Sequence, residues 1–261
     1  MTDSPPTTLR PGNALVTGAA KRIGRAVALD LAAAGWNVAI HYHNSADEAA
    51  SAVREIEALS RGAVAIKADL TREAEVAQIV PQAVAALGPL TCLVNSASVF
   101  VMDDIRSMTR ANWDRHIETN LRAPLVLSQA FAAQLPEKQQ GAIVNMLDER
   151  VWKLTPYFLS YTVAKSGLWT LTQTLALALA PRIRVNGIGP GPTLPSPRQS
   201  EAQFRAQWDS MPLKRGTTPA EICRAVRFIL ESPALTGQMI ALDGGQHLGW
   251  AVPGRGFVPE E

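Results

Sequence analysis

The stretch "NALVTGAAKRIGRAVALDLAAAG", residues 13–35, decides the fold class. The segment NALVT predicts a short buried strand, and an alanine-rich segment of helical period begins near Arg22. Between the two lies a turn that contains Gly18 and Gly24. A strand, a glycine turn and a helix in this order direct backbone N–H groups toward an anion, so the stretch predicts a nucleotide phosphate site. Arg22 stands inside this turn, where a small residue would let the backbone approach a phosphate.

The same alternation of strand and helix continues along the chain. Further strands are predicted in six short apolar runs: NVAIHY (37–42), AVAIK (63–67), LTCLVN (90–95), AIVNML (142–147), IRVNGI (183–188) and QMIALD (238–243). Helices are predicted to begin near Arg22, Ala46, Arg72, Asn112, Phe158 and Pro219. Gly35 and Gly88 are expected to end helices. This order predicts an α/β fold with a seven-stranded parallel sheet covered by helices.

Composition excludes several classes of protein. The 261 residues favour one domain, and 25 Lys and Arg against 23 Asp and Glu give a net charge of only +2. We therefore expect no nucleic-acid partner and no membrane surface. Cys92 and Cys223 have neither metal-ligand nor disulfide spacing, which indicates buried thiols. Residues 1–11 are polar and proline-rich, which predicts a disordered leader, no signal peptide and a cytoplasmic location.

One segment interrupts the strand and helix rhythm. Residues 189–219 are rich in proline and polar residues, and connections this long in compact domains are often lids or binding loops. We expect this segment to cover the substrate and to be partly helical around residues 202–208. A single domain is then expected to span residues 12–250, followed by a C-terminal tail at 251–261.

The end of the second predicted strand indicates the cofactor. An NAD site normally carries Asp or Glu there, but this chain has His41, Tyr42, His43, Asn44 and Ser45. No carboxylate stands there to repel a 2′-phosphate, and the Arg22 guanidinium can pair with one, so NADPH is the expected cofactor. The alternative for Arg22 is a solvated residue at the helix start. Two histidines without a third ligand predict no metal site.

Asp69, at the end of the third predicted strand, has two interpretations. Its carboxylate fits a hydrogen bond to adenine. It could instead cap the following helix, a role for which Thr71 competes.

A tyrosine and a lysine in "SYTVAKSGL" indicate proton transfer. Tyr161 and Lys165 are four residues apart, so on a helix they lie on one face. An ammonium close to a phenol favours the phenolate, so we expect the pKa of Tyr161 to be lowered toward the working pH.

The motifs TGAAKRIG, NSAS, ETNLRAP, YTVAK, RVNGIGPGPT and TGQMIALDGG, in this order, resemble the short-chain dehydrogenase/reductase family. The resemblance covers residues 12–248. It implies a single doubly wound Rossmann-type domain with a seven-stranded parallel sheet, a proton relay through Tyr161 and Lys165, and a supporting Asn120. It also implies a homotetramer built on long helices such as 113–135 and 156–180.

The family's glycine pattern, TGxxxGxG, has glycine where this chain has Arg22. The cofactor contacts implied are Gly18, Arg22, Ile23, Gly24, Tyr42, His43, Asn44, Ser45, Asp69, Leu70, Asn95, Ala97, Ser98, Tyr161, Lys165, Pro190, Gly191 and Thr193.

Asp148 departs from the family pattern, which usually places serine thirteen residues before the tyrosine. With Arg22, the HYHNS segment and NSASVF, it resembles the pteridine reductase subfamily and its bacterial dihydromonapterin-reductase relatives. The resemblance implies that Phe100 stacks on a pterin and that Arg22 reaches both the cofactor phosphate and the pterin. Phe100 as a packing residue and Asp148 as a loop cap are the alternatives. The implied substrate contacts are Arg22, Phe100, Asp148 and Tyr161.

The chemistry of Asp148 favours a C=N substrate. An ionised carboxylate repels the alkoxide that develops in ketone reduction, whereas it accepts N–H groups of an amino-pterin. We therefore expect an NADPH-dependent reductase of a pterin or folate, with Asp148, Tyr161, Lys165 and Asn120 as its catalytic residues. A carbonyl or 3-oxoacyl reductase and a non-catalytic NADP(H)-sensing protein are the alternatives. Which pterin or folate is reduced stays open.

Overall fold

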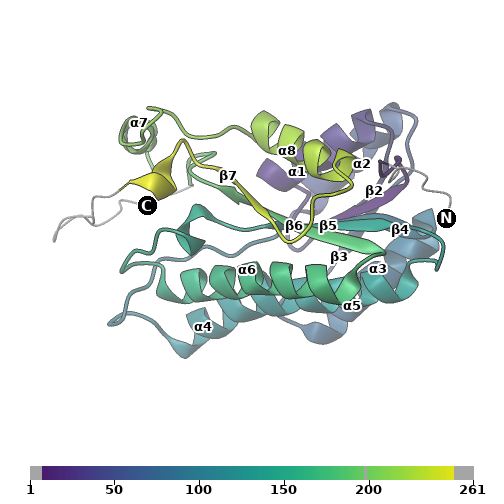
Figure 1. The fold of residues 1–261 in the computed structure, drawn as a ribbon, viewed down its shortest axis with the longest axis horizontal. Helices are drawn as coiled ribbons and strands as arrows, with labels where there is room; N and C mark the ends of the chain where they lie inside the picture. The colour runs from purple at the N-terminus through teal and green to yellow at the C-terminus, as the bar shows by residue number, and fades with distance from the viewer. Residues whose placement is uncertain (1–7, 197–198, 250–261) are drawn as a thin grey trace.

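The computed structural model describes residues 8–196 and 199–249. Its seven strands form one parallel sheet in the order β3-β2-β1-β4-β5-β6-β7, as predicted (Figure 1). The strands are β1 (Asn13–Val16), β2 (Asn37–Tyr42), β3 (Ala63–Lys67), β4 (Leu90–Asn95), β5 (Gly141–Met146), β6 (Ile183–Pro190) and β7 (Met239–Leu242). The predicted leader lies mostly, and the predicted C-terminal tail wholly, outside the described residues.

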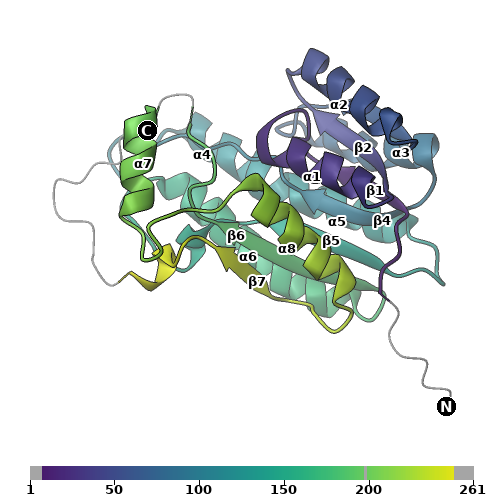
Figure 2. The same cartoon turned by 90° about the horizontal axis from the view of Figure 1, so that it is seen from above.

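Helices cover both faces of the sheet (Figures 1 and 2). One face carries α1 (Arg22–Ala33), α2 (Ala46–Ala58) and α8 (Pro219–Glu231). The other carries α3 (Glu73–Leu87), α4 (Arg110–Ile117), α5 (Ala123–Gln134) and α6 (Leu159–Leu179). A π-helical segment, η1 (Glu118–Arg122), joins α4 to α5. The two layers make this the doubly wound α/β fold that the motifs implied.

The central strands are buried on both faces, and their side chains alternate between two cores. In β1, Ala14 and Val16 pack with residues of α1, α2 and α8, whereas Leu15 packs with residues of α3 and α5. All three are fully buried. Burial on both faces explains why the strands read as continuous apolar runs. Burying a side chain such as Leu15 stabilises the fold by about 2 kcal/mol.

Local signals place most helix boundaries. Helices α1, α2 and α8 begin at the predicted residues, and α3 begins one residue later than predicted. Helix α4 begins at Arg110, two residues earlier than predicted, because the Thr109 hydroxyl accepts from the backbone N–H of Asn112 and caps it. Gly35 and Gly88 follow helices with φ of 101° and 86°, in the left-handed region that favours glycine.

The order of the strands locates the binding crevice. The chain leaves β1 toward β2 on one side and later places β4 on the other side, so the direction of winding reverses between β1 and β4. In open parallel sheets, ligands bind outside the carboxyl ends of the strands at such a point. The glycine turn after β1 and the loops after β4, β5 and β6 all open there.

The predicted lid is partly helical, as expected. Helix α7 (Glu201–Asp209) covers the predicted helical residues 202–208, while residues 197–198 lie outside the described part of the chain. Cys92 and Cys223 are both buried free thiols, which confirms their predicted packing role. Within the described ranges, no helix is long and apolar enough to cross a membrane.

His41 in β2 braces the glycine turn from below. The His41 side chain is 2 % exposed, its Nδ1 accepts from the Gly18 N–H at 3.2 Å, and its Nε2 lies 3.1 Å from the carbonyl oxygen of Ala68. Because Nδ1 accepts, Nε2 carries the proton and donates to Ala68. Burial lowers the pKa of His41 to about 4. The folded protein therefore holds this imidazole neutral, in one tautomer, under the predicted phosphate turn.

We expect His41 to destabilise the fold in acid. In the unfolded protein His41 binds a proton below its ordinary pKa of 6.5, whereas in the folded protein it stays neutral down to about pH 4. Because protonation in this range favours the unfolded state, stability is lost as pH falls through this window. Between pH 7 and pH 4 the free energy of unfolding of His41→Gln should therefore rise by about 3 kcal/mol relative to wild type. Urea unfolding at both pH values measures this difference. His43→Gln, which changes the exposed histidine two residues along, is the control and should show no such gain.

Candidate active site

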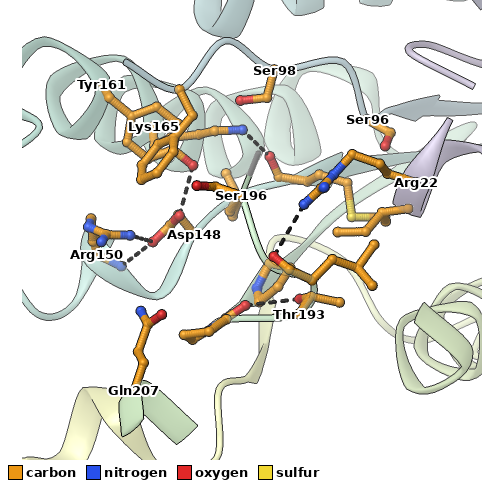
Figure 3. Close-up of a pocket in the computed structure, with 18 of the residues that line it drawn as sticks. Arg22, Ser96, Ser98, Asp148, Arg150, Tyr161, Lys165, Thr193, Ser196 and Gln207 are labelled. Carbon is orange, nitrogen blue, oxygen red and sulfur yellow. Dashed lines mark hydrogen bonds and ion pairs between the residues drawn. The ribbon is translucent and has the colours of Figure 1, made fainter. Parts of the chain in front are cut away.

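A cavity of about 230 Å³ opens at the carboxyl edge of the sheet. It lies among the glycine turn, the ends of β4, β5 and β6, the first turns of α6, and the segment that carries α7 (Figure 3). Ten predicted site residues line it: Arg22, Ile23, Ser98, Phe100, Asp148, Tyr161, Lys165, Pro190, Gly191 and Thr193. The structure thus brings together residues that are up to 171 positions apart, from Arg22 to Thr193.

The glycine turn is too tight for side chains at two positions. Gly18 has φ of 63°, and a Cβ there would lie 2.8 Å from the Cα of Ala97. A Cβ on Gly24 would lie 2.4 Å from the carbonyl oxygen of Gly18. No side chain caps the start of α1, so the orphan N–H groups of its first turn are left for another acceptor. This cradle of backbone donors fits the phosphates of a dinucleotide cofactor.

Arg22 adopts the conformation of the glycine that it replaces. Its φ is 54°, a left-handed conformation that costs a side-chain-bearing residue about 1–2 kcal/mol. Its guanidinium points toward the segment after β6 (Figure 3) and donates to the carbonyl oxygens of Pro195 at 2.9 Å and Leu194 at 3.2 Å. Arg22 is exposed at the start of α1, as the alternative interpretation expects, but its side chain also bridges the glycine turn to the predicted lid.

The predicted adenine end of the site lies apart from the cavity. Tyr42 ends β2, His43 and Asn44 are exposed, and the Nε2 of His43 lies 3.8 Å from the Oδ2 of Asp69. Asp69 Oδ1 accepts from the N–H and the hydroxyl of Thr71, so neither residue caps α3, whose N-cap is Arg72. The other predicted contacts outside the cavity lining are Gly18, Gly24, Ser45, Leu70, Asn95, Ala97 and Asn120.

Asn95 is buried between two strands. Its amide nitrogen donates to the Oδ1 of Asn145 at 2.8 Å, and the amide of Asn145 donates to the Thr172 hydroxyl at 2.9 Å. Asn95 is 3 % exposed, and its Oδ1 accepts no hydrogen bond. The side chain therefore ties β4 to β5 and α6 within the sheet.

Asp148 and Tyr161 are joined by a hydrogen bond. The Tyr161 hydroxyl donates to the Oδ2 of Asp148 at 2.7 Å. The other oxygen, Oδ1, accepts from the backbone N–H of Arg150 at 2.9 Å and lies 3.4 Å from its guanidinium (Figure 3). Asp148 thus also caps the short helix η2 (Glu149–Val151), which was the alternative interpretation. One carboxylate oxygen serves the loop, while the other faces the phenol.

The predicted lowering of the Tyr161 pKa is wrong. Burial, and next the charge of Asp148, raise the pKa of Tyr161 well above its ordinary value. Lys165 does not compensate, because its Nζ donates to the carbonyl oxygen of Met146 at 2.6 Å. Burial also lowers the pKa of Lys165 to about 8. The phenol is consequently a protonated donor here, which suits the delivery of a proton.

Phe100 lines the cavity and is already partly stacked. Its ring packs on that of Phe158, with 4.4 Å between centroids and 7° between planes, and meets Tyr161 edge-on at 4.7 Å. Packing is therefore one role of Phe100. Asn120 lies in η1, where its amide both accepts from the N–H of Val99 and donates to its carbonyl oxygen. Single π-helical turns of this kind are frequent at functional sites.

Sequence reasoning missed several residues of the cavity. Arg150 is the most consequential, since its side chain is 12 % exposed and pairs with Asp148. Glu149 is buried beside it, and burial together with the Asp148 charge raises its pKa. Three charges in the run DER, next to a buried strand, were the available signal. The remaining missed lining residues are Ser96, Met146, Leu147, Pro192, Leu194, Ser196, Gln199, Phe204 and Gln207.

Metal chemistry has no visible ligand set. Among residues 8–196 and 199–249, no group of three or more His, Cys, Asp or Glu side chains could hold a metal ion.

The chain is similar to known reductases in sequence. Residues 18–247 match a family model described as Enoyl-(Acyl carrier protein) reductase. The 3-oxoacyl-[acyl-carrier-protein] reductase FabG of Staphylococcus epidermidis is 33% identical over 241 residues, which are 90% of this chain and 99% of the relative.

Two solved structures are also similar. FolM alternative dihydrofolate reductase 1 from Brucella canis, complexed with NADP, has a TM-score of 0.90 and 47% identity over 95% of this chain and 98% of its own. FolM alternative dihydrofolate reductase 1 from Brucella suis, in complex with NADP, has a TM-score of 0.89 and 48% identity. The match covers 93% of this chain and 97% of the Brucella suis chain. The parallel sheet, the tight glycine turn and the Tyr161 and Lys165 pair agree with these matches, and the chain belongs to the short-chain dehydrogenase/reductase family of oxidoreductases.

Proposed function

We propose that this chain is an NADPH-dependent reductase of a dihydropterin or dihydrofolate. The hydrogen bond between Tyr161 and Asp148 is the observation that carries the proposal, because it puts a proton donor and a fixed anion side by side in the cavity. The similar FolM structures, with NADP, support both the cofactor and the substrate class.

NADPH, when bound, supplies the hydride for the C=N carbon. The chain's own residues supply the proton and the orientation. Tyr161 is neutral, and its hydroxyl would donate to the adjacent ring nitrogen, after which the phenolate must be reprotonated. Asp148 would accept N–H groups of the amino-pterin and so align the ring with the phenol. Lys165, whose pKa burial lowers to about 8 and whose Nζ lies 5.7 Å from the centre of the Tyr161 ring, would hold cofactor oxygen atoms and return a proton.

The cofactor would lie along the carboxyl edge of the sheet. Its phosphates fit the uncapped start of α1, and Arg22, His43, Asn44 and Ser45 are the candidate partners of a 2′-phosphate. Asp69, with its second oxygen facing His43, lies on the side expected for adenine. Pro190, Gly191 and Thr193 would face the nicotinamide from β6, where a Cβ on Gly191 would lie 2.9 Å from the Cα of Asp243.

A 3-oxoacyl or carbonyl reductase is the second candidate, favoured by the FabG relative. Asp148 argues against it, because Oδ2 occupies the place beside the phenol where a ketone oxygen needs neutral or positive donors. A cofactor-sensing protein without activity is the remaining alternative.

The oligomer implied by the family resemblance, a homotetramer, stays part of the proposal.

A substrate panel tests the reaction. We expect NADPH oxidation, followed at 340 nm, with dihydropterins or dihydrofolate, and little with activated ketones. Tyr161→Phe should lower turnover by about 10²- to 10⁴-fold with little change in NADPH affinity, since it removes only the transferable proton. Turnover of ketones alone would contradict the proposal, and NADPH binding without turnover of any substrate would favour the sensor.

Asp148→Ser separates the two reductase candidates. For a pterin reductase, the change removes the acceptor of substrate N–H groups, so pterin turnover should fall by about 10²-fold or more while ketone turnover does not fall. For a ketone reductase, the new hydroxyl supplies a neutral donor and activity should rise. Steady-state rates of both proteins on a dihydropterin and on an activated ketone decide between them. Undiminished pterin turnover would remove Asp148 from the mechanism.

Arg22→Gly tests the cofactor preference. Glycine suits the φ of 54°, so the turn should keep its shape, while one charged hydrogen bond worth about 1.5–3 kcal/mol is lost. NADPH affinity should fall about 10- to 100-fold, and NADH affinity should stay. Lys21→Ser, which removes the neighbouring cation paired with Glu48 at 2.7 Å, is the control. A variant that keeps the full NADPH preference would assign Arg22 to the lid alone.

A further inference from the structure

Two polar side chains hold the residues on either side of Phe100. His116 in α4 and Asn120 in η1 are four residues apart and lie on one face of the continuous helix. The Val101 N–H donates to the Nε2 of His116 at 3.1 Å, and the Val99 N–H donates to Asn120 at 2.8 Å. The backbone on both sides of this ring is therefore fixed by side chains.

His116 continues into a buried chain of hydrogen bonds. Because its Nε2 accepts from Val101, the proton must be on Nδ1, which lies 2.7 Å from the Ser160 hydroxyl oxygen. The Ser160 hydroxyl oxygen accepts a hydrogen bond from Nδ1, and the hydroxyl donates one to the Oδ2 of Asp103. The Oδ1 of Asp103 accepts from the Ser160 backbone N–H at 3.2 Å. Each group is thus assigned one proton position by its neighbour.

This trio is not a hydrolytic triad. A nucleophilic serine donates to its histidine, whereas Ser160 accepts from His116 and donates to the aspartate. All three residues are also at most 1 % exposed, so no substrate reaches the hydroxyl. These hydrogen bonds can therefore only position the loop and the helix that carry the three residues.

This series of hydrogen bonds connects the loop that carries Phe100 to the start of the helix that carries Tyr161. Ser160 directly precedes Tyr161, and the Phe158 N–H donates to the carbonyl oxygen of Asp103 at 2.7 Å. Phe158, which precedes α6 with φ of 58°, in turn stacks on Phe100. Both ends of the aromatic contact between Phe100 and Tyr161 are therefore anchored to Asp103.

We propose that His116, Ser160 and Asp103 are positioning residues that hold the Phe100 ring at a fixed distance and angle from the Tyr161 phenol. A flat heteroaromatic substrate placed against Phe100 then meets the proton donor in one orientation only. An error of about 1 Å in such placement can cost about 10²-fold in rate. The substrate class in this inference rests on the proposed function. The proton order, meaning which atoms of His116, Ser160 and Asp103 donate and which accept, does not.

The proton order has a test that needs no substrate. The chain has four histidines, so ¹⁵N-imidazole NMR with His41→Gln, His43→Gln and His247→Gln assigns His116 by elimination. Because its Nε2 accepts from the Val101 N–H, we expect a neutral His116 with its proton on Nδ1 at pH 7. Burial, with a smaller contribution from Arg115, lowers its pKa, which the nearby Asp103 opposes. A proton on Nε2, or an imidazolium, would overturn the proposed chain.

The kinetic test is Asp103→Asn, a change of nearly equal shape. The N–H and the hydroxyl of Ser160 donate to different oxygens of Asp103, and asparagine has an oxygen at only one of these two positions, so one of the two bonds is lost or reversed. We expect kcat/KM for a dihydropterin to fall about 10²-fold with a raised KM, while the NADPH Kd from fluorescence titration stays within about twofold of wild type. Asp104→Asn is the matched control, because Asp104 is only partly buried and its Oδ1 accepts from the backbone of Arg106 and Ser107, as an amide oxygen also can.

The two failures are distinguishable. If wild type reduces no dihydropterin, the proposed function fails, and the NMR result alone decides the proton order. If wild type is active and Asp103→Asn retains wild-type kcat/KM with intact NADPH binding, the positioning role is overturned. If Asp103→Asn does not bind NADPH, Ser160→Ala replaces it, with the same pattern expected and the same result overturning it.

Discussion

The hydrogen bond from Tyr161 to Asp148 is the interaction on which the chemistry of this site depends. It joins the loop after β5 to the first turn of α6 across a distance of 2.7 Å, at the wall of the cavity, and Tyr161 is 5 % exposed. A carboxylate beside a buried phenol makes the phenol a weaker acid, so Tyr161 stays protonated. Arg150 and the η2 backbone fix the opposite oxygen of Asp148 and limit its repulsion of other negative charge. This arrangement supports the proposed reduction of substrates that bring N–H donors and require a proton.

The fold could be predicted almost completely because its signals are local. The strands are apolar runs, and two of the predicted helices, α4 and α8, begin after a capping threonine, such as Thr218 before Pro219 and Glu221. The errors were displacements of one or two residues, as at α4. The Asp148 and Tyr161 pair was predicted from the family resemblance, in which a polar residue thirteen positions before the tyrosine shares its site.

The electrostatics of the site could not be predicted from spacing. Tyr161 and Lys165 share a helix face, but spacing does not show that Lys165 points to the Met146 carbonyl or that burial acts on both groups. The same limit applies to His116, Ser160 and Asp103. They are 57 positions apart at most, on separate elements, and each is a common residue type on its own. Only their three-dimensional contact gives them a role.

Two features allow Arg22 to stand inside the glycine turn. The backbone accepts the left-handed conformation that a glycine would otherwise provide, and the side chain uses the position to reach the carbonyl oxygens of residues 194 and 195. The cavity therefore has one wall fixed by buried networks on α4, η1 and α6, and another attached to the glycine turn through a single guanidinium. If the guanidinium also binds cofactor phosphate, then cofactor binding and the position of the lid segment share one residue. Under the proposed function, proton delivery would depend on the first wall, and the position of the second wall would depend on Arg22.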